Sequence, residues 1–163
     1  MPRGSHSIEI QASTSKVFDL IHDYDLRLTW DSMLKQATLL DGATMAATGV
    51  RSRCVGNWKC FWLPMETKYV SFTSGSVAAV KLVNRPWFFD DFAATIRHEN
   101  IESTNRSRTT YIYSFRAKPK WLRPILEPLM KLAMNREVKN RLAALKRHLE
   151  PVSYTHLTLP TKA

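Results

Sequence analysis

The most informative stretch of this sequence is LMKLAMNREVKNRLAALKRHLE, residues 129–150. Its apolar residues recur at the three- and four-residue spacing of an amphipathic helix: Leu129, Ala133, Met134, Val138, Leu142, Leu145 and Leu149. The charged residues fall mostly elsewhere on the helix: Lys131, Arg136, Lys139, Arg141, Lys146 and Arg147. Pro128 can start a helix or kink one. The pattern predicts a long helix from about Pro128 to Glu150 with one face against a core.

The chain before this helix predicts a run of β-strands. Between residues 35 and 117, alternating apolar and polar residues are separated by turn signals such as Asp41-Gly42 and Ser74-Gly75. Connections this short hold no crossover helices, which favours an antiparallel meander. A further strand is expected around Ile8 and Ile10, followed by a helix capped by Ser13. The sequence therefore predicts an α+β fold with six or seven strands.

Composition limits the class of protein. The 163 residues, 44% hydrophobic and 23% charged, suit one globular domain with a buried core. No apolar run approaches the roughly 20 residues that span a bilayer, and the N-terminus lacks the apolar stretch of a secretory signal. We expect a cytoplasmic protein, in which Cys54 and Cys60 stay reduced.

Both ends of the chain carry segments that do not fit the domain. The tail PVSYTHLTLPTKA, residues 151–163, breaks the helical pattern, and residues 152–161 resemble one reading frame of a sequencing adapter. We therefore expect a domain over residues 6–150 and a non-native tail, the alternative being a genuine disordered tail. The N-terminal PRGSH resembles the remnant of a tag.

A formal net charge of +10 raises the question of acidic partners. Lys and Arg are spread over strands and helix, and the chain has no zinc-finger spacing, RNA-binding aromatic motif or basic arm. No DNA-binding motif is present. Ribosome, RNA or an anionic membrane remain possible partners, and the sequence leaves the oligomeric state open.

Three segments carry a resemblance to a known family: SIEIQASTSKVFDLIHDYDLRLTW (7–30), SRTTYIYSFRAKP (107–119) and NREVKNRLAALKRHLE (135–150). Together they resemble the START-like (SRPBCC) superfamily, in its polyketide cyclase/dehydrase and lipid-transport branch. The resemblance covers nearly all of residues 6–150. It implies the helix-grip fold, in which a curved antiparallel sheet wraps around a long C-terminal helix and encloses a hydrophobic cavity. Members bind lipids, polyketides, hormones or quinones, and a minority catalyse cyclisation or dehydration. Ser107 stands where a Gly often precedes the last strand, and the middle of the chain is unusually rich in Trp.

Strand parity predicts which side chains face such a cavity. The inward set, with residues from the helix, gives these ligand-binding candidates: Trp58, Leu82, Phe92, Ile96, Tyr111, Tyr113, Phe115, Met130 and Met134. The alternative is that these side chains simply fill a core.

Non-catalytic binding of an apolar small molecule (lipid, polyketide or isoprenoid-like) is the favoured function. A cyclase or dehydratase using the same cavity, and a basic module for ribosome, RNA or membrane, are the alternatives. His98 is the one candidate general base, since it falls on the inward parity. Asp90 and Asp91 are adjacent and would face opposite sides of a strand. We expect no metal site and no cofactor, because no known nucleotide, metal or nucleophile motif occurs.

Overall fold

Seven strands form one antiparallel sheet in the order β1-β7-β6-β5-β4-β3-β2 in the computed structural model, which describes residues 1–102 and 105–150. The strands are β1 (Arg3–Ile10), β2 (Leu34–Leu39), β3 (Arg51–Gly56), β4 (Pro64–Thr73), β5 (Val77–Leu82), β6 (Phe89–Ile101) and β7 (Arg106–Ala117). The predicted α+β helix-grip fold is confirmed. The tail predicted for residues 151–163 lies outside the described residues.

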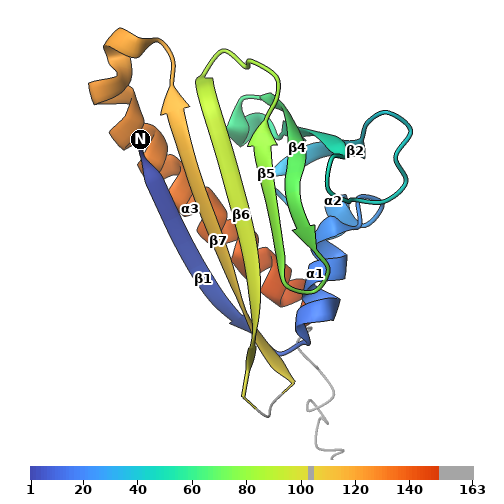
Figure 1. Ribbon diagram of the computed structural model, residues 1–163. Helices are drawn as coiled ribbons and strands as arrows, with labels where there is room; N and C mark the ends of the chain where they lie inside the picture. Colours follow the sequence, from blue (N-terminus) through green and yellow to red (C-terminus); the bar gives the residue numbers. More distant parts are fainter. Residues whose placement is uncertain (103–104, 151–163) are drawn as a thin grey trace, which may run out of the picture.

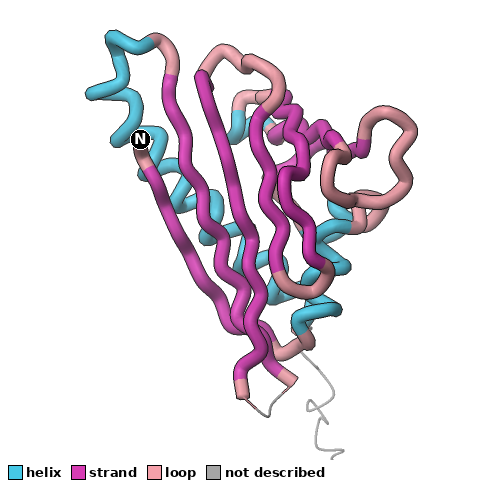
Figure 2. The backbone as a smooth tube through the Cα atoms, viewed as in Figure 1, coloured by secondary structure: helices cyan, strands magenta, loops and turns pink. Residues whose placement is uncertain are grey.

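The helices lie on one face of this curved sheet (Figures 1 and 2). They are α1 (Thr14–His22), α2 (Arg27–Trp30) and the long α3 (Arg123–Leu149), with short 3-10 turns η1 (Trp58–Cys60) and η2 (Lys120–Leu122). The α1–α2 segment carries the chain from one edge of the sheet to the other, and α3 crosses behind β1, β7 and β6. Within the described part of the chain, no helix is long and apolar enough to cross a membrane.

Local sequence explains where the first helix begins. The Ser13 side chain accepts a hydrogen bond from the backbone N–H of Lys16 at 3.2 Å, which satisfies a donor that the helix itself cannot. The predicted cap is therefore confirmed. Beyond it, α1 buries Val17, Phe18 and Ile21 against the sheet, the spacing of one helical face.

The last strand follows its predicted parity. Along β7 the buried residues alternate with more exposed ones: Ser107, Thr109, Tyr111, Tyr113, Phe115 and Ala117. These side chains point to the concave side, where α3 covers them. Tyr111, Tyr113 and Phe115 belong to the main core together with Ile10, Val138, Leu142 and Leu145.

The long helix differs from its prediction in two ways. It begins at Arg123, five residues before Pro128, which lies inside it. Only its second half buries an apolar face, whereas Leu129 is 62% exposed and Leu132 is 70% exposed. The predicted single apolar face through Leu129 is therefore wrong, because α3 packs mainly on β1 and β7 and its first half reaches past the packed core.

The second half of α3 is tied to the first strand. Lys146 Nζ donates to the carbonyl oxygen of Glu9 at 2.8 Å, and the Glu150 carboxylate accepts from the backbone N–H of Gln11. These contacts hold the end of the helix against the edge of the sheet. The first half is left above the strands, where a space remains between helix and sheet.

Candidate functional site

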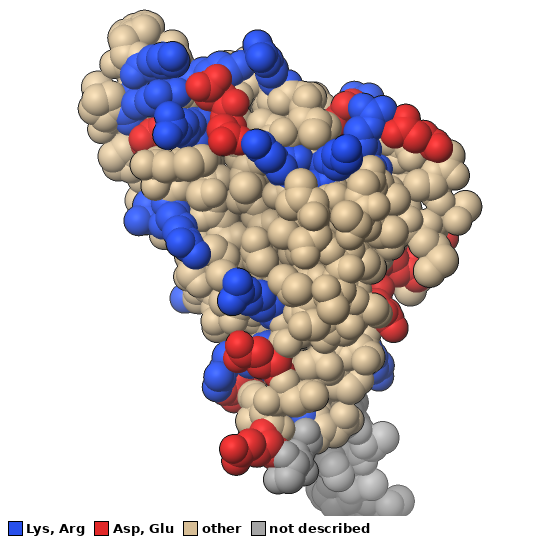
Figure 3. All heavy atoms as spheres, viewed as in Figure 1, with Lys and Arg blue, Asp and Glu red and all other residues tan. Residues whose placement is uncertain are grey.

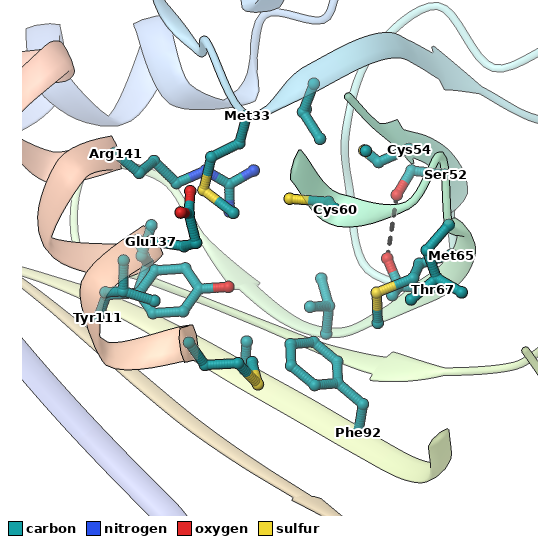
Figure 4. Close-up of a pocket in the computed structure, with 18 of the residues that line it drawn as sticks. Met33, Ser52, Cys54, Cys60, Met65, Thr67, Phe92, Tyr111, Glu137 and Arg141 are labelled. Carbon is teal, nitrogen blue, oxygen red and sulfur yellow. Dashed lines mark hydrogen bonds between the residues drawn. The ribbon is translucent and has the colours of Figure 1, made fainter. Parts of the chain in front are cut away.

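A pocket of about 360 Å³ lies between the concave face of the sheet and the middle of α3, from Met130 to Arg141 (Figure 4). Its walls are mostly apolar and come from β4, β5, β6 and α3: Met65, Ala78, Val80, Phe92, Ala94, Ile96, Met130 and Met134. The exposed residues Lys59 and Phe61 also line it. The pocket therefore reaches the surface beside η1.

Five of the nine predicted binding residues line this pocket. They are Phe92, Ile96, Tyr111, Met130 and Met134. The structure brings these residues together from β6, β7 and α3, although they lie up to 42 positions apart in the chain. In Figure 4 the ring of Tyr111 points its hydroxyl into the space between sheet and helix.

Three further candidates are buried outside the lining. Tyr113 and Phe115 are 1% and 0% exposed, and Leu82 is 8% exposed within the main core. The hydroxyl of Tyr113 donates to the Asn135 side chain on α3. Its ring lies against Gly4, where an added Cβ would come within 2.3 Å of the ring. Tyr113 and Phe115 fill the core because α3 packs directly on β7.

Trp58 was expected on a strand facing the cavity, and the structure places it elsewhere. β3 ends at Gly56, and the Asn57 side chain accepts from the backbone N–H of Lys59 at 3.0 Å, which starts η1. Trp58 is 66% exposed as a result. The inward parity was wrong here because a capped turn, rather than a continuous strand, follows Gly56.

His98 lies outside the pocket lining. Its ring is buried near the end of β6, with Nδ1 3.0 Å from the Thr109 hydroxyl and its edge against Phe18. Burial lowers its pKa to about 4. A molecule in the pocket would not touch this ring, so the geometry gives His98 no contact through which to act as a general base.

A buried ion cluster, absent from the sequence prediction, closes one side of the pocket. Oδ2 of Asp31 accepts from Nε of Arg27 at 2.9 Å and from Nε of Arg141 at 2.8 Å. The Asp31 side chain is fully buried, and the two arginine side chains are 10% and 13% exposed. The cluster joins α2 to α3. The i,i+4 spacing of Arg27 and Asp31 was visible in the sequence, but Arg141 was expected on the charged face of its helix.

The charged groups of this cluster keep one another ionised. Burial alone would raise the pKa of the Asp31 carboxyl, but Arg141 and Arg27 outweigh burial and hold that pKa below its usual value. Burial likewise disfavours charge on Arg141, and Asp31 nevertheless raises its pKa. Both arginines and the carboxylate are therefore charged at neutral pH.

A second polar group lines the inner wall beside α1. The Tyr69 hydroxyl lies 3.0 Å from His22 Nδ1 and 3.0 Å from the Tyr24 hydroxyl. Burial, with help from the nearby charge of Arg27, lowers the pKa of His22 to about 3. Burial raises the pKa of Tyr69 well above its ordinary value. At neutral pH the group is uncharged and can present only hydrogen-bonding atoms to a guest.

Glu137 and two thiols also belong to the polar part of the lining. Among residues 1–102 and 105–150, the Glu137 side chain forms no hydrogen bond or ion pair, and Figure 4 shows its carboxylate directed toward the pocket beside Arg141. Burial raises the pKa of both Cys54 and Cys60, and neither forms a disulfide. In the same described ranges, no three His, Cys, Asp or Glu side chains gather to hold a metal ion.

We expect acid to destabilise the fold through His22 and His98. Their folded pKa values, about 3 and about 4, lie below the ordinary value of 6.5. The unfolded chain therefore binds more protons below pH 6.5, so the stability that these residues contribute is complete above pH 6.5 and is lost as pH falls toward 4. Each contributes a slope of about 1.4 kcal/mol per pH unit in that window. Urea unfolding at pH 7, 6 and 5 measures the slope.

The variant His98→Gln isolates one of these contributions. Its amide can still bond Thr109, and the free energy of unfolding should fall less steeply with acid than in the wild type, by about 1.4 kcal/mol per pH unit. Equal slopes for the two proteins would show that His98 does not titrate with unfolding.

The sequence and the architecture of this chain are similar to those of known proteins. The model of the family described as polyketide cyclase / dehydrase and lipid transport matches residues 1–150. A START superfamily protein from Mycobacterium smegmatis has 12% identity and a TM-score of 0.75, over 93% of this chain and 99% of its own. The aromatase/cyclase Zhui from Streptomyces sp. R1128 has 11% identity and a TM-score of 0.71, over 92% and 96%. No curated protein matches the sequence.

Proposed function

Because the chain belongs to the polyketide cyclase/dehydrase and lipid transport family of START-like proteins, we propose that its pocket binds an apolar small molecule without transforming it. A lipid, a polyketide or an isoprenoid-like compound would suit such walls. The observation that carries the proposal is the apolar pocket itself. Its volume of about 360 Å³ falls within the range of about 300–1,000 Å³ usual for small-molecule sites.

The polar part of the lining suggests how a guest would be oriented. Two of the charged lining groups, Arg141 and Glu137, come from α3 and face Tyr111, while the walls toward β5 and β6 are aliphatic or aromatic. A molecule with one polar end would place that end at Glu137 and Tyr111, since burying a polar group without a partner is costly. Its apolar body would then lie over Ala78 and Ala94, whose small side chains leave the space.

The protonation states favour binding over catalysis. A base works best when its pKa lies near the working pH, and that of His22 is about 3. The thiols of Cys54 and Cys60 have raised pKa values and are therefore protonated, whereas the thiolate is the nucleophile.

One observation favours the alternative, a cyclase or dehydratase. The carboxylate of Glu137 lines the pocket without a bond to any described residue, so it could exchange a proton with a substrate. The two functions are separated by incubating the protein with a candidate ligand and measuring the mass of the recovered ligand by mass spectrometry. An unchanged mass supports a carrier, and loss of water that disappears in Glu137→Gln supports dehydration.

Filling the pocket should abolish binding. Ala94 is buried in the lining, and Ala94→Phe would occupy the space over β6. We expect this variant to bind the apolar dye N-phenyl-1-naphthylamine at least tenfold more weakly than the wild type, or about 1.4 kcal/mol. Fluorescence titration measures the affinity.

The neighbouring position provides the matched control. Ala93 lies on the same strand with its side chain on the opposite face of the sheet, outside the pocket lining. Ala93→Phe adds the same ring and should bind the dye like the wild type. Equal affinities for the two variants, both folded by circular dichroism, would refute the pocket as the binding site.

A further inference from the structure

One end of the molecule exposes an unusual number of large apolar side chains. We define the mouth surface as Trp58, Phe61, Trp62, Trp87, Trp121 and Ile125, which are between 57% and 78% exposed. They belong to η1 and the residues after it, the loop between β5 and β6, and η2 with the start of α3, all at the upper end in Figure 1. Four of the five tryptophans therefore lie on one surface, and the fifth, Trp30, is buried.

The mouth surface is continuous with the pocket. Phe61 lines the pocket, and its ring centre lies 5.9 Å from that of Phe88, another lining residue. Phe88 in turn packs on Trp87, with ring centres 3.3 Å apart. The carbonyl oxygen of Phe88 accepts from the backbone N–H of Lys118 at 2.9 Å, which joins this loop to the segment before η2. An apolar path therefore leads from the pocket to the outside.

Two residues of the mouth surface have a strained backbone conformation. Phe61 and Trp62 have φ values of 54° and 49°, in the left-handed region that side chains with a Cβ disfavour. These residues are nevertheless 69% and 57% exposed, so the contact of Phe61 with Phe88 is small burial to set against the strain. On α3, Leu129 and Leu132 continue the exposed stripe that Ile125 begins. Scattered apolar residues need no explanation, but this many large apolar side chains exposed at one end of the molecule, next to a pocket, mark an interaction surface.

The Lys and Arg side chains at the mouth end of the molecule form few ion pairs. In the described residues, the cations here that form no ion pair with a carboxylate include Lys59, Arg85, Lys118, Lys120 and Lys131. The nearby carboxylates of Asp90 and Glu127 both pair with Arg123 instead, at 2.9 and 3.8 Å. Figure 3 shows Lys and Arg side chains over the upper ends of β5, β6 and β7, with a smaller number of Asp and Glu side chains among them. The mouth is therefore both apolar and positively charged.

We propose that the mouth surface docks on an anionic lipid membrane, with the pocket opening against the bilayer. Tryptophan settles at the boundary between headgroups and acyl chains. Lys and Arg nearby are attracted to the negative potential of anionic lipids. The aliphatic side chains of Ile125 and Leu129 can enter the acyl region. This inference goes beyond the proposed function, because docking does not require a filled pocket.

Two other occupants fit the surface less well. A second copy of the chain would bring the same unpaired cations face to face, since a two-fold interface pairs each patch with itself. Single-stranded RNA could stack on the tryptophans, but it would leave Ile125 and Leu129 without a role. An anionic bilayer satisfies the aromatic, aliphatic and cationic side chains together.

Sedimentation with lipid vesicles tests the proposal. The wild type should bind vesicles of phosphatidylcholine mixed with phosphatidylserine at least tenfold more tightly than vesicles of phosphatidylcholine alone, and salt should weaken the binding. Trp121→Ser and Lys120→Glu should each lower this partitioning several-fold, and the double variant Trp62→Ser/Trp121→Ser at least tenfold. Two matched changes away from the mouth should leave it unchanged: Leu28→Ser on α2 and Lys139→Glu on the second half of α3.

Three results would overturn the proposal. The first is equal vesicle binding by the mouth-surface variants and the control variants. The second is concentration-dependent dimerisation that Trp121→Ser abolishes, with no vesicle binding. The third is tighter binding of the protein to poly(U) than to anionic vesicles. Ala94→Phe keeps this test separate from that of the proposed function. Suppose that the pocket binds no ligand and that the mouth surface still docks on membranes. Then Ala94→Phe and the wild type sediment equally with the vesicles, and neither protein binds the dye.

Discussion

Replacing Asp31 by asparagine is expected to lower the free energy of unfolding by about 3–5 kcal/mol, the loss typical of removing one partner from a buried ion pair. Asp31 is the only carboxylate bonded to both Arg27 and Arg141 in the described residues. Without its charge, two buried guanidinium groups would face each other with no carboxylate bonded between them. The link between α2 and α3 would be lost as well. Urea unfolding followed by circular dichroism measures the change.

An exposed ion pair supplies the control for Asp31→Asn. Asp41 binds Arg51 at 2.8 Å, but its side chain is 60% exposed, so water replaces the pair when it is broken. Asp41→Asn should therefore change stability little. The pKa of Asp31 is held below its usual value, so its contribution is present above about pH 4 and is lost as pH falls below that. If Asp31→Asn is no more destabilising than Asp41→Asn at pH 7, the cluster does not stabilise the fold.

The second large effect concerns the packed half of α3. Leu142 is 1% exposed in the main core, and truncating a buried leucine to alanine costs about 2–5 kcal/mol because the lost contacts leave a cavity. Leu142→Ala should lower the midpoint of urea unfolding accordingly. Leu132→Ala makes the same chemical change on the same helix at a side chain that is 70% exposed. It should cost far less, and similar losses at the two positions would show that the halves of α3 do not differ in packing.

The architecture could be predicted because its signals are local. The two-residue alternation along Tyr111, Tyr113 and Phe115 needs only the geometry of one strand, and the structure confirms it. The same holds for the cap at Ser13 and for the helical spacing of Val138, Leu142 and Leu145. Parity, however, says only that a side chain points inward. Whether it fills the core, as Phe115 does, or lines the pocket, as Tyr111 does, depends on where α3 lies above the sheet.

The polar half of the site could not be predicted for the same reason. Asp31 and Arg141 are 110 positions apart. The helical period places Arg141, unlike the exposed Lys139, beside Val138 and Leu145, but it does not reveal which distant carboxylate Arg141 meets. The exposure of Trp58 likewise follows from a turn capped by Asn57, which a run of aromatic and β-branched residues conceals. The chemistry of this pocket depends on contacts between distant segments, and such contacts leave no mark in local patterns.

The position of β1 has a consequence for the order in which the chain folds. Each strand from β2 to β7 pairs with the next along the sequence, so this part can form from successive hairpins, which are fast to close. β1 pairs only with β7, and Ser7 meets Thr110, 103 positions away. Non-local pairing of this kind slows folding because a long loop must close first. On the ribosome, β1 would be made before the other six strands of this sheet and would be the last of the seven to join it, and the main core would stay open until residues 107–150 have followed.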